Sequence, residues 1–192
     1  MLKITTFGNN ADILVANARF ILRRVACKTY KGWDEDFDMS FDKRSIWVIS
    51  SDNTRKIHGF CKVVFATNDQ RLPSEYNKEM IFINKNEMHC AEVTSFIYRD
   101  FNQAHMVVRA AMLEIERLGC ELCFCTVDTT NIKALNLITE SYKFRRYHAN
   151  PITFSGMWYS RCNGIPLWSY LVQDKISRLE TILDLTTGLY QE

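Results

Sequence analysis

Glu92 is the residue whose type and position best suit it to take a proton from an amine. It lies inside the run HCAEVTSFIY, residues 89–98, whose β-branched and aromatic residues predict a strand. Burial disfavours the charged form of a carboxylate, so a buried Glu92 has a raised pKa, which suits a general base for an amine. Two alternatives stay open: an ion pair with Arg23 or Arg24, and a place on a solvated face of the strand.

The turn that follows this strand, Arg99 to Ala104, has the outline of a phosphate site. Its sequence is RDFNQA, and a helix is expected to begin inside it. A helix N-terminus offers unpaired N–H groups and a positive dipole end, and such an end binds phosphate. Asn102 tolerates the unusual backbone angles that Gly would otherwise supply. Asn102 could equally be an ordinary N-cap, and Arg99 either contacts a phosphate or lies solvated.

An acidic, aromatic segment lies nearer the N-terminus. Its sequence is WDEDFD, residues 33–38. Its carboxylates could bind a cationic amine acceptor, with Trp33, Asp36 and Asp38 as the candidate contacts. The alternative is a solvated loop that two aromatic side chains anchor.

The cysteines and histidines do not predict a metal site. Cys120 and Cys123 form one Cys-x-x-Cys with no second pair at ligand spacing, which is a weak indication of metal. Cys123 and Cys125 alternate with apolar residues along a strand, so they are expected to point to one face as small core residues. The four histidines show no metal spacing. We therefore expect no metal.

The elements that must position these residues follow from periodicity. An amphipathic helix is predicted over residues 11–30, with its apolar side at Ile13, Ala16, Phe20 and Val25. A second helix over residues 102–119 favours Met106, Ala110, Leu113 and Leu118 on one side, with Gly119 as C-cap. The remaining predictions are a hairpin of strands 45–50 and 57–66, strands 89–98, 120–128, 144–149 and 153–160, and helices 129–142 and 169–185.

This order predicts an α/β fold, a mixed sheet with helices on both faces. The β-α-β unit over residues 89–128 should give a parallel pair with a right-handed crossover. A chain of 192 residues is expected to form a single domain, residues 1–192. A formal charge of +2 is too small to imply nucleic-acid binding. No run reaches the roughly 18 apolar residues of a membrane helix. With seven Cys and no apolar leader, we expect a reduced, cytoplasmic protein.

Three stretches make the chain resemble the GNAT acyltransferase fold. The GNAT pattern Arg/Gln-x-x-Gly-x-Gly/Ala matches at Arg99 and Ala104, with Asn102 in place of the central Gly. A later GNAT pattern, Asn-x-x-Ala followed by an aromatic residue, matches at Asn131 and Ala134. The predicted hairpin has the usual Gly near the start of its second strand.

A narrower resemblance is to acyl-homoserine-lactone synthases and long-chain N-acyl amino acid synthases, which have the GNAT fold and take acyl chains from acyl carrier protein. It is carried by an early Arg, a Trp, spaced Asp residues and a strand Glu-x-x-x-Phe, at Arg24, Trp33, Asp36, Asp38, Glu92 and Phe96. Ser95 stands where the lactone synthases have Arg, so the resemblance does not extend to lactone synthesis from S-adenosylmethionine.

The resemblance implies an N-acyltransferase that moves an acyl group from acetyl-CoA, a longer acyl-CoA or the phosphopantetheine of acyl carrier protein to a primary amine. It implies that donor-binding residues lie on the strand and at the helix starts: Phe96, Ile97, Arg99, Asn102, Gln103, Ala104 and Asn131. GNAT enzymes often place a general-acid Tyr where this chain has Ile138. Tyr142, one turn later, is the candidate acid, and a core aromatic is the alternative.

The partners and rival functions complete the expectations. Lys143, Arg145, Arg146 and Arg161 form a basic cluster that could steer the acidic carrier protein or protect a strand edge. The protein could be a monomer or a homodimer. Two rival functions stay open: an ordinary acetyl-CoA-dependent acetyltransferase, and a catalytically inactive ligand-binding protein of the same fold.

Overall fold

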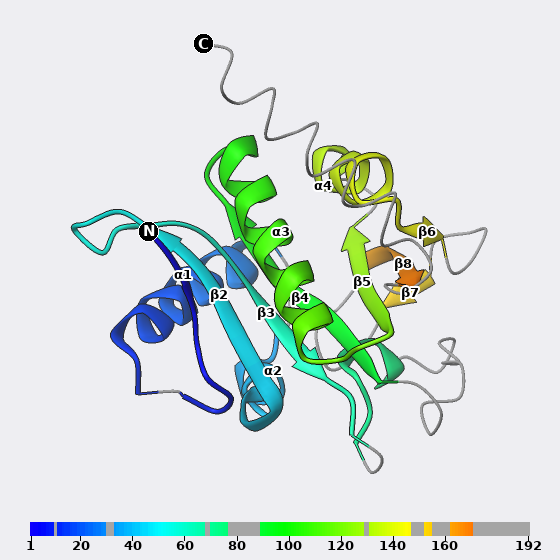
Figure 1. Ribbon diagram of the computed structural model, residues 1–192, viewed down its shortest axis with the longest axis horizontal. Coiled ribbons are helices and arrows are strands. Elements are labelled where there is room, and N and C mark those ends of the chain that lie inside the picture. Colours follow the sequence, from blue (N-terminus) through cyan, green and yellow to red (C-terminus); the bar gives the residue numbers. More distant parts are fainter. Residues whose placement is uncertain are drawn as a thin grey trace.

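The molecule is built on one twisted sheet, and two long helices cover the opposite faces of this sheet (Figure 1). The computed structural model describes residues 1–9, 11–29, 33–67, 70–76, 89–128, 131–146, 152–154 and 162–170; for 145–146, 152–154 and 162–170 it describes the backbone alone. The strands are β1 (Leu2–Ile4), β2 (Ser45–Ser51), β3 (Ile57–Phe65), β4 (Cys90–Tyr98), β5 (Leu122–Asp128), β6 (Arg145–Arg146), β7 (Ile152–Phe154) and β8 (Cys162–Tyr170).

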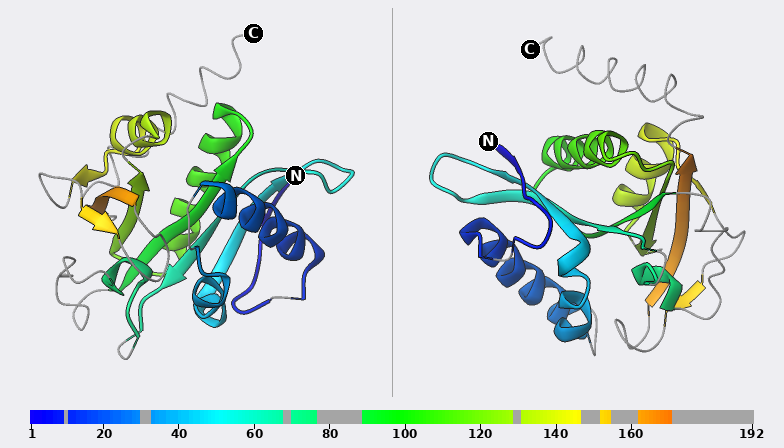
Figure 2. Two further views of the ribbon diagram at one scale, coloured as in Figure 1. Left: turned by 180° about the vertical axis from the view of Figure 1, so that it is seen from behind. Right: turned by 60° about the horizontal axis from the view of Figure 1, so that its bottom comes forward.

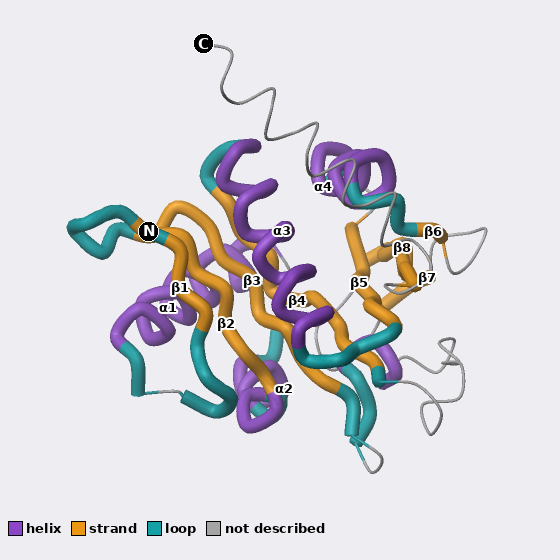
Figure 3. Tube along the Cα trace, in the orientation of Figure 1, coloured by secondary structure: helices purple, strands orange, loops and turns teal. Residues whose placement is uncertain are grey.

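The sheet is mixed, as the element order predicts. Its strand order is β1-β2-β3-β4-β5-β8-β6, and β7 pairs with β8. Only the β4–β5 pair is parallel among these strands; every other pair is antiparallel. The parallel pair flanks a helix, so the predicted β-α-β unit is present. Figure 3 distinguishes the strands of this sheet from the helices around it.

The helices form the outer layers. They are α1 (Ile13–Thr29), α2 (Glu35–Met39), α3 (Phe101–Arg117) and α4 (Ile132–Asn136), with a π-helical turn from Leu137 to Ser141. Two 3-10 turns, Asp42–Arg44 and Pro73–Tyr76, precede β2 and β4. The right-hand view of Figure 2 shows α1 on one side of the sheet and α3 on the other. Successive side chains of β2 point to opposite faces of the sheet. Val48 therefore packs in the core beneath α3, and Ile49 packs in the core beneath α1.

The predicted core face of α1 is wrong, and that of α3 is confirmed only at Ala110 and at the half-buried Leu118. Ile13, Phe20 and Val25 of α1 are exposed, and the buried side is Leu14, Val15, Ala18, Leu22 and Ala26. In α3, Met106 and Leu113 are exposed, and the buried residues are Ala104, Val107, Val108, Ala110, Ala111, Met112 and Ile115. Apolar residues occur all round each helix, so periodicity admits two faces and tertiary packing selects one.

The ends of α3 follow local chemistry. Asp100, not Asn102, is the N-cap, and its carboxylate accepts a hydrogen bond from the Gln103 N–H at 3.0 Å. Gly119 has a φ of +78°, and its N–H donates to the Glu116 carbonyl while the Cys120 N–H donates to the Ile115 carbonyl. This is the Schellman arrangement, so the predicted role of Gly119 at the helix end is confirmed.

The chain after β5 departs from prediction. Strand β8, Cys162–Tyr170, occupies a stretch that was not predicted as a strand, and its last two residues lie where a helix over 169–185 was expected to begin. Asn163, Gly164 and Pro166 lower the strand propensity of β8, but pairing along the whole of β5 overrides it. Residues 171–185 lie outside the described residues, as do most of 153–160 and 144–149 beyond β6 and β7.

Candidate active site

Strands β4 and β5 separate halfway along their length. They pair from Cys90 with Leu122 to Val93 with Cys125, and the ladder stops there. On its other side β4 carries a bulge, because Thr94 pairs with Lys62 and Ile97 with Phe60, which places three steps on β4 against two on β3. Ser95 lies in this bulge with a φ of +54°, a left-handed conformation uncommon for a residue with a side chain. The bend opens the sheet.

A cavity of about 300 Å³ fills the opening and reaches both faces of the sheet. One side, which we call the apolar half, is lined by residues of the core beneath α3 and α4: Val93, Phe96, Val108, Cys125, Ala134 and Ile138. The opposite side, which we call the acidic half, is lined by residues of α1, α2 and β4: Leu22, Val25, Thr29, Trp33, Asp38 and Glu92. The two halves therefore present different chemistry to a ligand.

Glu92 lies at the floor of the acidic half. It is 1% exposed, and burial raises its pKa from 4.5 to about 7. Its two carboxylate oxygens accept hydrogen bonds from Ser74, one from the N–H at 2.9 Å and one from the hydroxyl. The expected burial is therefore present, whereas an ion pair with Arg23 and a solvated position are not: Arg23 lies against Glu35 instead. Arg24 lies exposed over the ring of Phe20.

Ser74 holds Glu92 by a short relay. Because its single hydroxyl hydrogen goes to Glu92, the Thr126 hydroxyl at 2.9 Å must donate to the Ser74 oxygen. Ser74 is itself 1% exposed, and Thr126 lines the cavity. A carboxyl group with a pKa near 7 at the edge of a cavity can accept a proton at neutral pH and give it back.

Asp38 is part of a buried charge network. Its Oδ2 lies 2.5 Å from Nζ of Lys62, whose side chain is 0% exposed, and Nζ also donates to the Asp38 carbonyl at 2.7 Å. The Ser95 hydroxyl donates to the other oxygen, Oδ1, at 3.2 Å. Asp38 thus ties α2 to β3 and to the bulge of β4. An ion pair without solvent needs such additional hydrogen bonds.

The network continues away from the cavity. Nζ of Lys62 lies 3.7 Å from Oδ1 of Asp42, and Oδ2 of Asp42 forms an ion pair with Arg19 of α1. Burial raises the pKa of Asp42, against the opposing influence of Lys62 and Arg19. Arg19 and Lys62 both lie over the ring of Trp47. Two cations and two carboxylates therefore alternate beneath the acidic half.

The predicted phosphate turn is already capped by a carboxylate. The Asp100 carboxylate accepts a hydrogen bond from the Gln103 N–H. Its negative charge therefore lies at the N-terminus of α3, where a phosphate would need free N–H groups. The Arg99 N–H donates to the His58 carbonyl at 2.8 Å, and the Arg99 side chain is exposed. Asn102 is exposed in the first turn of α3. The turn is thus less favourable for an anion than its sequence pattern indicates.

The other predicted donor contacts divide into two groups. Phe96, Ile97 and Asn131 line the cavity. Asn131 is also the N-cap of α4 and accepts a hydrogen bond from the Ala134 N–H at 3.2 Å. Gln103 and Ala104 do not line the cavity: Gln103 accepts a hydrogen bond from the Ser50 hydroxyl at 2.6 Å, and Ala104 is wholly buried on the inner face of α3.

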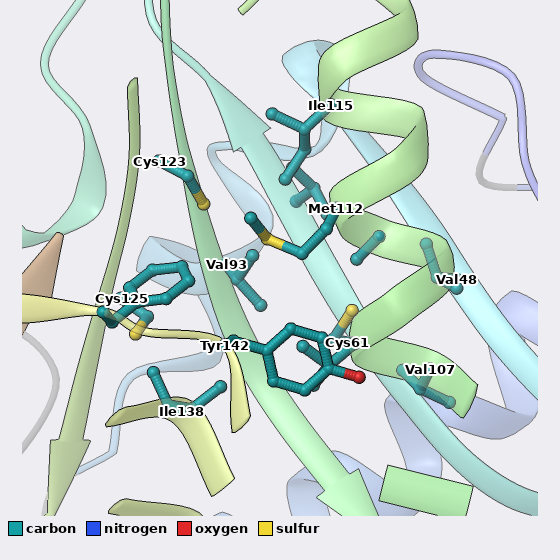
Figure 4. Close-up of a cluster of buried hydrophobic side chains, with 14 of the residues drawn as sticks. Val48, Cys61, Val93, Val107, Met112, Ile115, Cys123, Cys125, Ile138 and Tyr142 are labelled. Carbon is teal, nitrogen blue, oxygen red and sulfur yellow. The ribbon is translucent and has the colours of Figure 1, made fainter. Parts of the chain in front are cut away.

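The structure does not bring Tyr142 to the cavity lining. Its side chain is 2% exposed and lies among the buried side chains beneath α3 (Figure 4). Its hydroxyl donates to the His105 carbonyl at 3.0 Å. Burial raises its pKa. Ile138, at the position where the resemblance places an acid, does line the cavity but has no proton to give. Of the two roles that the sequence left open for Tyr142, general acid or core aromatic, the structure shows the core aromatic.

The acidic segment is a short helix and not a loop. Asp34 caps α2 by accepting the Phe37 N–H at 3.0 Å. Of the three residues expected to bind substrate, Trp33 and Asp38 line the cavity, whereas Asp36 is exposed outside it. Alternation around the helix explains the difference, because residues two apart do not share a face.

Several residues that line the cavity, or that hold its lining in place, carried no sequence indication. Ser74 comes from a segment expected only to be a loop, and Lys62 looks like one polar residue in an apolar strand. Leu22 and Thr29 belong to a face of α1 that was not the predicted one. Neighbouring Cys123 and Cys125 are buried, as expected (Figure 4). The basic side chains of Arg145, Arg146 and Arg161 lie outside the described residues.

Metal and membrane features were searched in the part of the chain that the structure describes. No group of three or more His, Cys, Asp or Glu there is placed to hold a metal ion. No helix of that part has the length and apolar character needed to cross a membrane.

Comparison with known proteins identifies the fold. No family model and no curated protein matches the chain. FeeM, an N-acyl amino acid synthase from uncultured soil microbes, matches with a TM-score of 0.70 at 15% identity, over 95% of this chain and 97% of FeeM. TofI in an apo form matches with a TM-score of 0.67 at 14% identity, over 89% of this chain and 91% of TofI.

An Arabidopsis thaliana protein, NAA60 in complex with acetyl-CoA, also matches, with a TM-score of 0.58 at 10% identity, over 90% of this chain and 99% of that one. An N-acetyltransferase from Staphylococcus aureus Mu50 matches with a TM-score of 0.59 at 11% identity. The chain therefore has the GNAT-like fold that its sequence pattern indicates.

Proposed function

We propose that this protein transfers an acyl group from an acyl thioester to a primary amine. The observation that carries the proposal is the buried Glu92, with a pKa of about 7, at the cavity where β4 and β5 separate. The fold shared with acyl- and acetyltransferases supports the same reaction class. Fold alone does not set function, so the weight rests on the chemistry of the cavity.

The reaction is a direct aminolysis. The nitrogen lone pair of the neutral amine attacks the thioester carbonyl carbon, the C–N bond forms and the C–S bond breaks. The proton lost by the nitrogen passes to the Glu92 carboxylate, which then gives it to the leaving thiolate, directly or through solvent, so that the base is regenerated. Holding both substrates in one cavity supplies much of the rate, and a thiolate leaves readily, so no acidic Tyr is required.

The donor enters along the separated strands. Beyond Val93 the edge of β4 has no β5 partner, so main-chain groups of residues 94–98 can hydrogen-bond a pantetheine-like arm. The apolar half, with Phe96, Val108 and Ile138, then receives the acyl chain. This lining favours an acyl group longer than acetyl, from either acyl-CoA or acyl carrier protein.

The acceptor occupies the acidic half. Trp33 offers an aromatic face and Asp38 a carboxylate, both on the same side of the sheet as Glu92. An ammonium group can approach these groups and lose one proton to solvent, and the neutral amine that results gives its second proton to Glu92 as it attacks. The substrates thus meet from opposite faces, at the point where the sheet opens.

The proposal is tested by thermal shift and by thiol release on the same purified protein. Donors are acetyl-CoA, octanoyl-CoA, palmitoyl-CoA and an octanoyl-loaded acyl carrier protein, with CoA alone as control. A donor at ~100 times its Kd should add ~2.7 kcal/mol of stability. Shifts that grow with chain length, together with thiol release in the presence of primary amines, are expected. A largest shift for acetyl-CoA favours the acetyltransferase; shifts without thiol release favour a binding protein.

A further inference from the structure

The charged residues that line the cavity are all of one sign. Asp38, Glu92 and Asp128 are acidic, and among the lining residues that the structure describes there is no Lys, Arg or His. The cavity is therefore an environment for positive charge, whichever thioester enters its apolar half.

The basic side chains near the cavity, Lys62, Arg44 and Arg19, are bound to protein partners. Nζ of Lys62 is held by the carboxylate and the carbonyl of Asp38, and its side chain is 0% exposed, so it cannot reach a ligand. The guanidinium of Arg44 donates to the carbonyls of Phe65, at 2.8 Å, and of Arg71. Arg19 pairs with Asp42 outside the cavity.

The donors at Glu92 are also occupied. Both the N–H and the hydroxyl of Ser74 already point at the Glu92 carboxylate. The described residues offer a second carboxylate at this place no guanidinium fork, and the unpaired main-chain groups of residues 94–98 lie along the path proposed for the donor. The second carboxylate would instead face Glu92 and Asp38.

This arrangement discriminates between two kinds of amine. In an α-amino acid the carboxylate is two bonds from the nitrogen, so a nitrogen placed to give its proton to Glu92 carries that carboxylate into the acidic half. An amine without the carboxylate avoids this repulsion, and a second ammonium group further along gains attraction from the same side chains.

We propose that the acceptor is a primary amine with no carboxylate beside its nitrogen, and that cationic diamines are the preferred class. This inference rests on the proposed function, because it assigns the acceptor of the same cavity. It sets the acceptor of this chain apart from the amino acids named for FeeM.

The test uses pairs of amines that differ only by the α-carboxylate: cadaverine with lysine, and tyramine with tyrosine. Each amine is measured twice with the full chain, by calorimetric binding and by mass-spectrometric yield of amide with octanoyl-CoA and with octanoyl-loaded acyl carrier protein. We expect kcat/KM and affinity at least tenfold higher for the member without the carboxylate, with cadaverine above tyramine. Equal values, or a preference for the amino acid, overturn the inference.

The two readouts separate this inference from the proposed function. Cadaverine binding without any amide product contradicts acyl transfer but leaves the acceptor class standing. Amide formed on the α-nitrogen of lysine as readily as on cadaverine supports acyl transfer and overturns the acceptor class, whereas amide on the ε-nitrogen does not, because that nitrogen has no carboxylate beside it. Binding of neither diamine nor amino acid overturns the acceptor class as well.

A charge introduced at the cavity wall tests the electrostatic cause. Thr29 is exposed at the end of α1 and lines the acidic half. Thr29→Lys should narrow the cadaverine-to-lysine ratio at least threefold, because it supplies the missing cation. Thr29→Met introduces a side chain about as long as that of lysine but without its charge. It should leave the cadaverine-to-lysine ratio within twofold of the wild-type value. An unchanged ratio in Thr29→Lys overturns the electrostatic explanation.

Discussion

The apolar half of the cavity is made from side chains that a sheet and its helices would bury in any case, whereas the acidic half contains charges whose burial costs free energy. Val108 and Ile138 gain stability from leaving water. Glu92, Asp38 and Lys62 are equally buried, and each needs hydrogen bonds or an opposite charge to remain so.

The two halves also differ in how they can be changed. Substitutions in the apolar half alter volume and should alter the choice of acyl chain. Substitutions in the acidic half alter charge and should alter proton transfer, amine binding and the pH dependence of stability. The following predictions test this division.

The largest expected effect on stability comes from Lys62→Met. Removing Nζ leaves Asp38 and Asp42 buried without their shared cation, and breaking a buried pair costs about 3–5 kcal/mol. Chemical denaturation measures the loss. The double variant Lys62→Met/Asp38→Asn should recover part of it; a double variant as unstable as the sum of the single ones would show that the pair is not coupled.

The next effect is the pH dependence that Glu92 gives to stability. Its pKa is about 7 in the folded protein and 4.5 as the ordinary value, so the folded state holds more protons between these pH values. Stability should therefore fall as pH rises from about 4.5 to 7, by up to about 3 kcal/mol. Glu92→Gln should remove this slope in denaturation curves.

Glu140→Gln is the matched control, because Glu140 is an exposed carboxylate on the π-helical turn. It should change stability by less than about 0.5 kcal/mol and leave the slope in place. A slope that survives in Glu92→Gln would assign the titration to another group, such as Asp42.

A pair of volume changes compares the two halves directly. Val108→Phe fills the apolar half and should lower kcat/KM for octanoyl donors relative to acetyl donors about tenfold, since each methylene excluded costs about 0.8 kcal/mol. Val25→Phe, on the acidic half, should instead raise KM for the amine and leave the preference for chain length unchanged. Steady-state kinetics measures both. The same change of chain-length preference in both variants would contradict the division.

The smallest expected effect concerns the end of α3. Asp100→Asn keeps an N-cap but removes the charge that faces an incoming phosphate. Binding of CoA should become about two- to fivefold tighter, as a charge at a helix end is worth about 0.3–1 kcal/mol. The gain should fade as salt is raised in calorimetry. Unchanged affinity would place the phosphates of the donor away from this turn.

Much of the fold could be predicted from the sequence because its strongest patterns are local. The hairpin of β2 and β3, strand β4 and the helix with Gly119 at its end are each defined by residues close together. The core faces of α1 and α3 could not be predicted, since both helices carry apolar residues on more than one side. Strand β8 depends on its pairing with β5, far away in sequence.

The candidate site was predicted in part for the same reason. Glu92 and Asp38 stand out as charged residues next to apolar and aromatic ones, and both line the cavity. Ser74 and Lys62 become recognisable only through the contacts they make in three dimensions. Asp100 and Asn102 are two residues apart and both suit an N-cap, so the choice depends on where the helix begins.

The most direct test of the account is the pH dependence of kcat/KM for acyl transfer, measured in the wild type and in Glu92→Gln. A base with a pKa of about 7 predicts that the rate, expressed per concentration of neutral amine, rises about tenfold per pH unit below pH 7 and levels off above it. Glu92→Gln should lose about 10²- to 10⁴-fold in rate and lose this inflection, with donor affinity retained. An unchanged rate, or the same inflection in the variant, would contradict a catalytic role for Glu92.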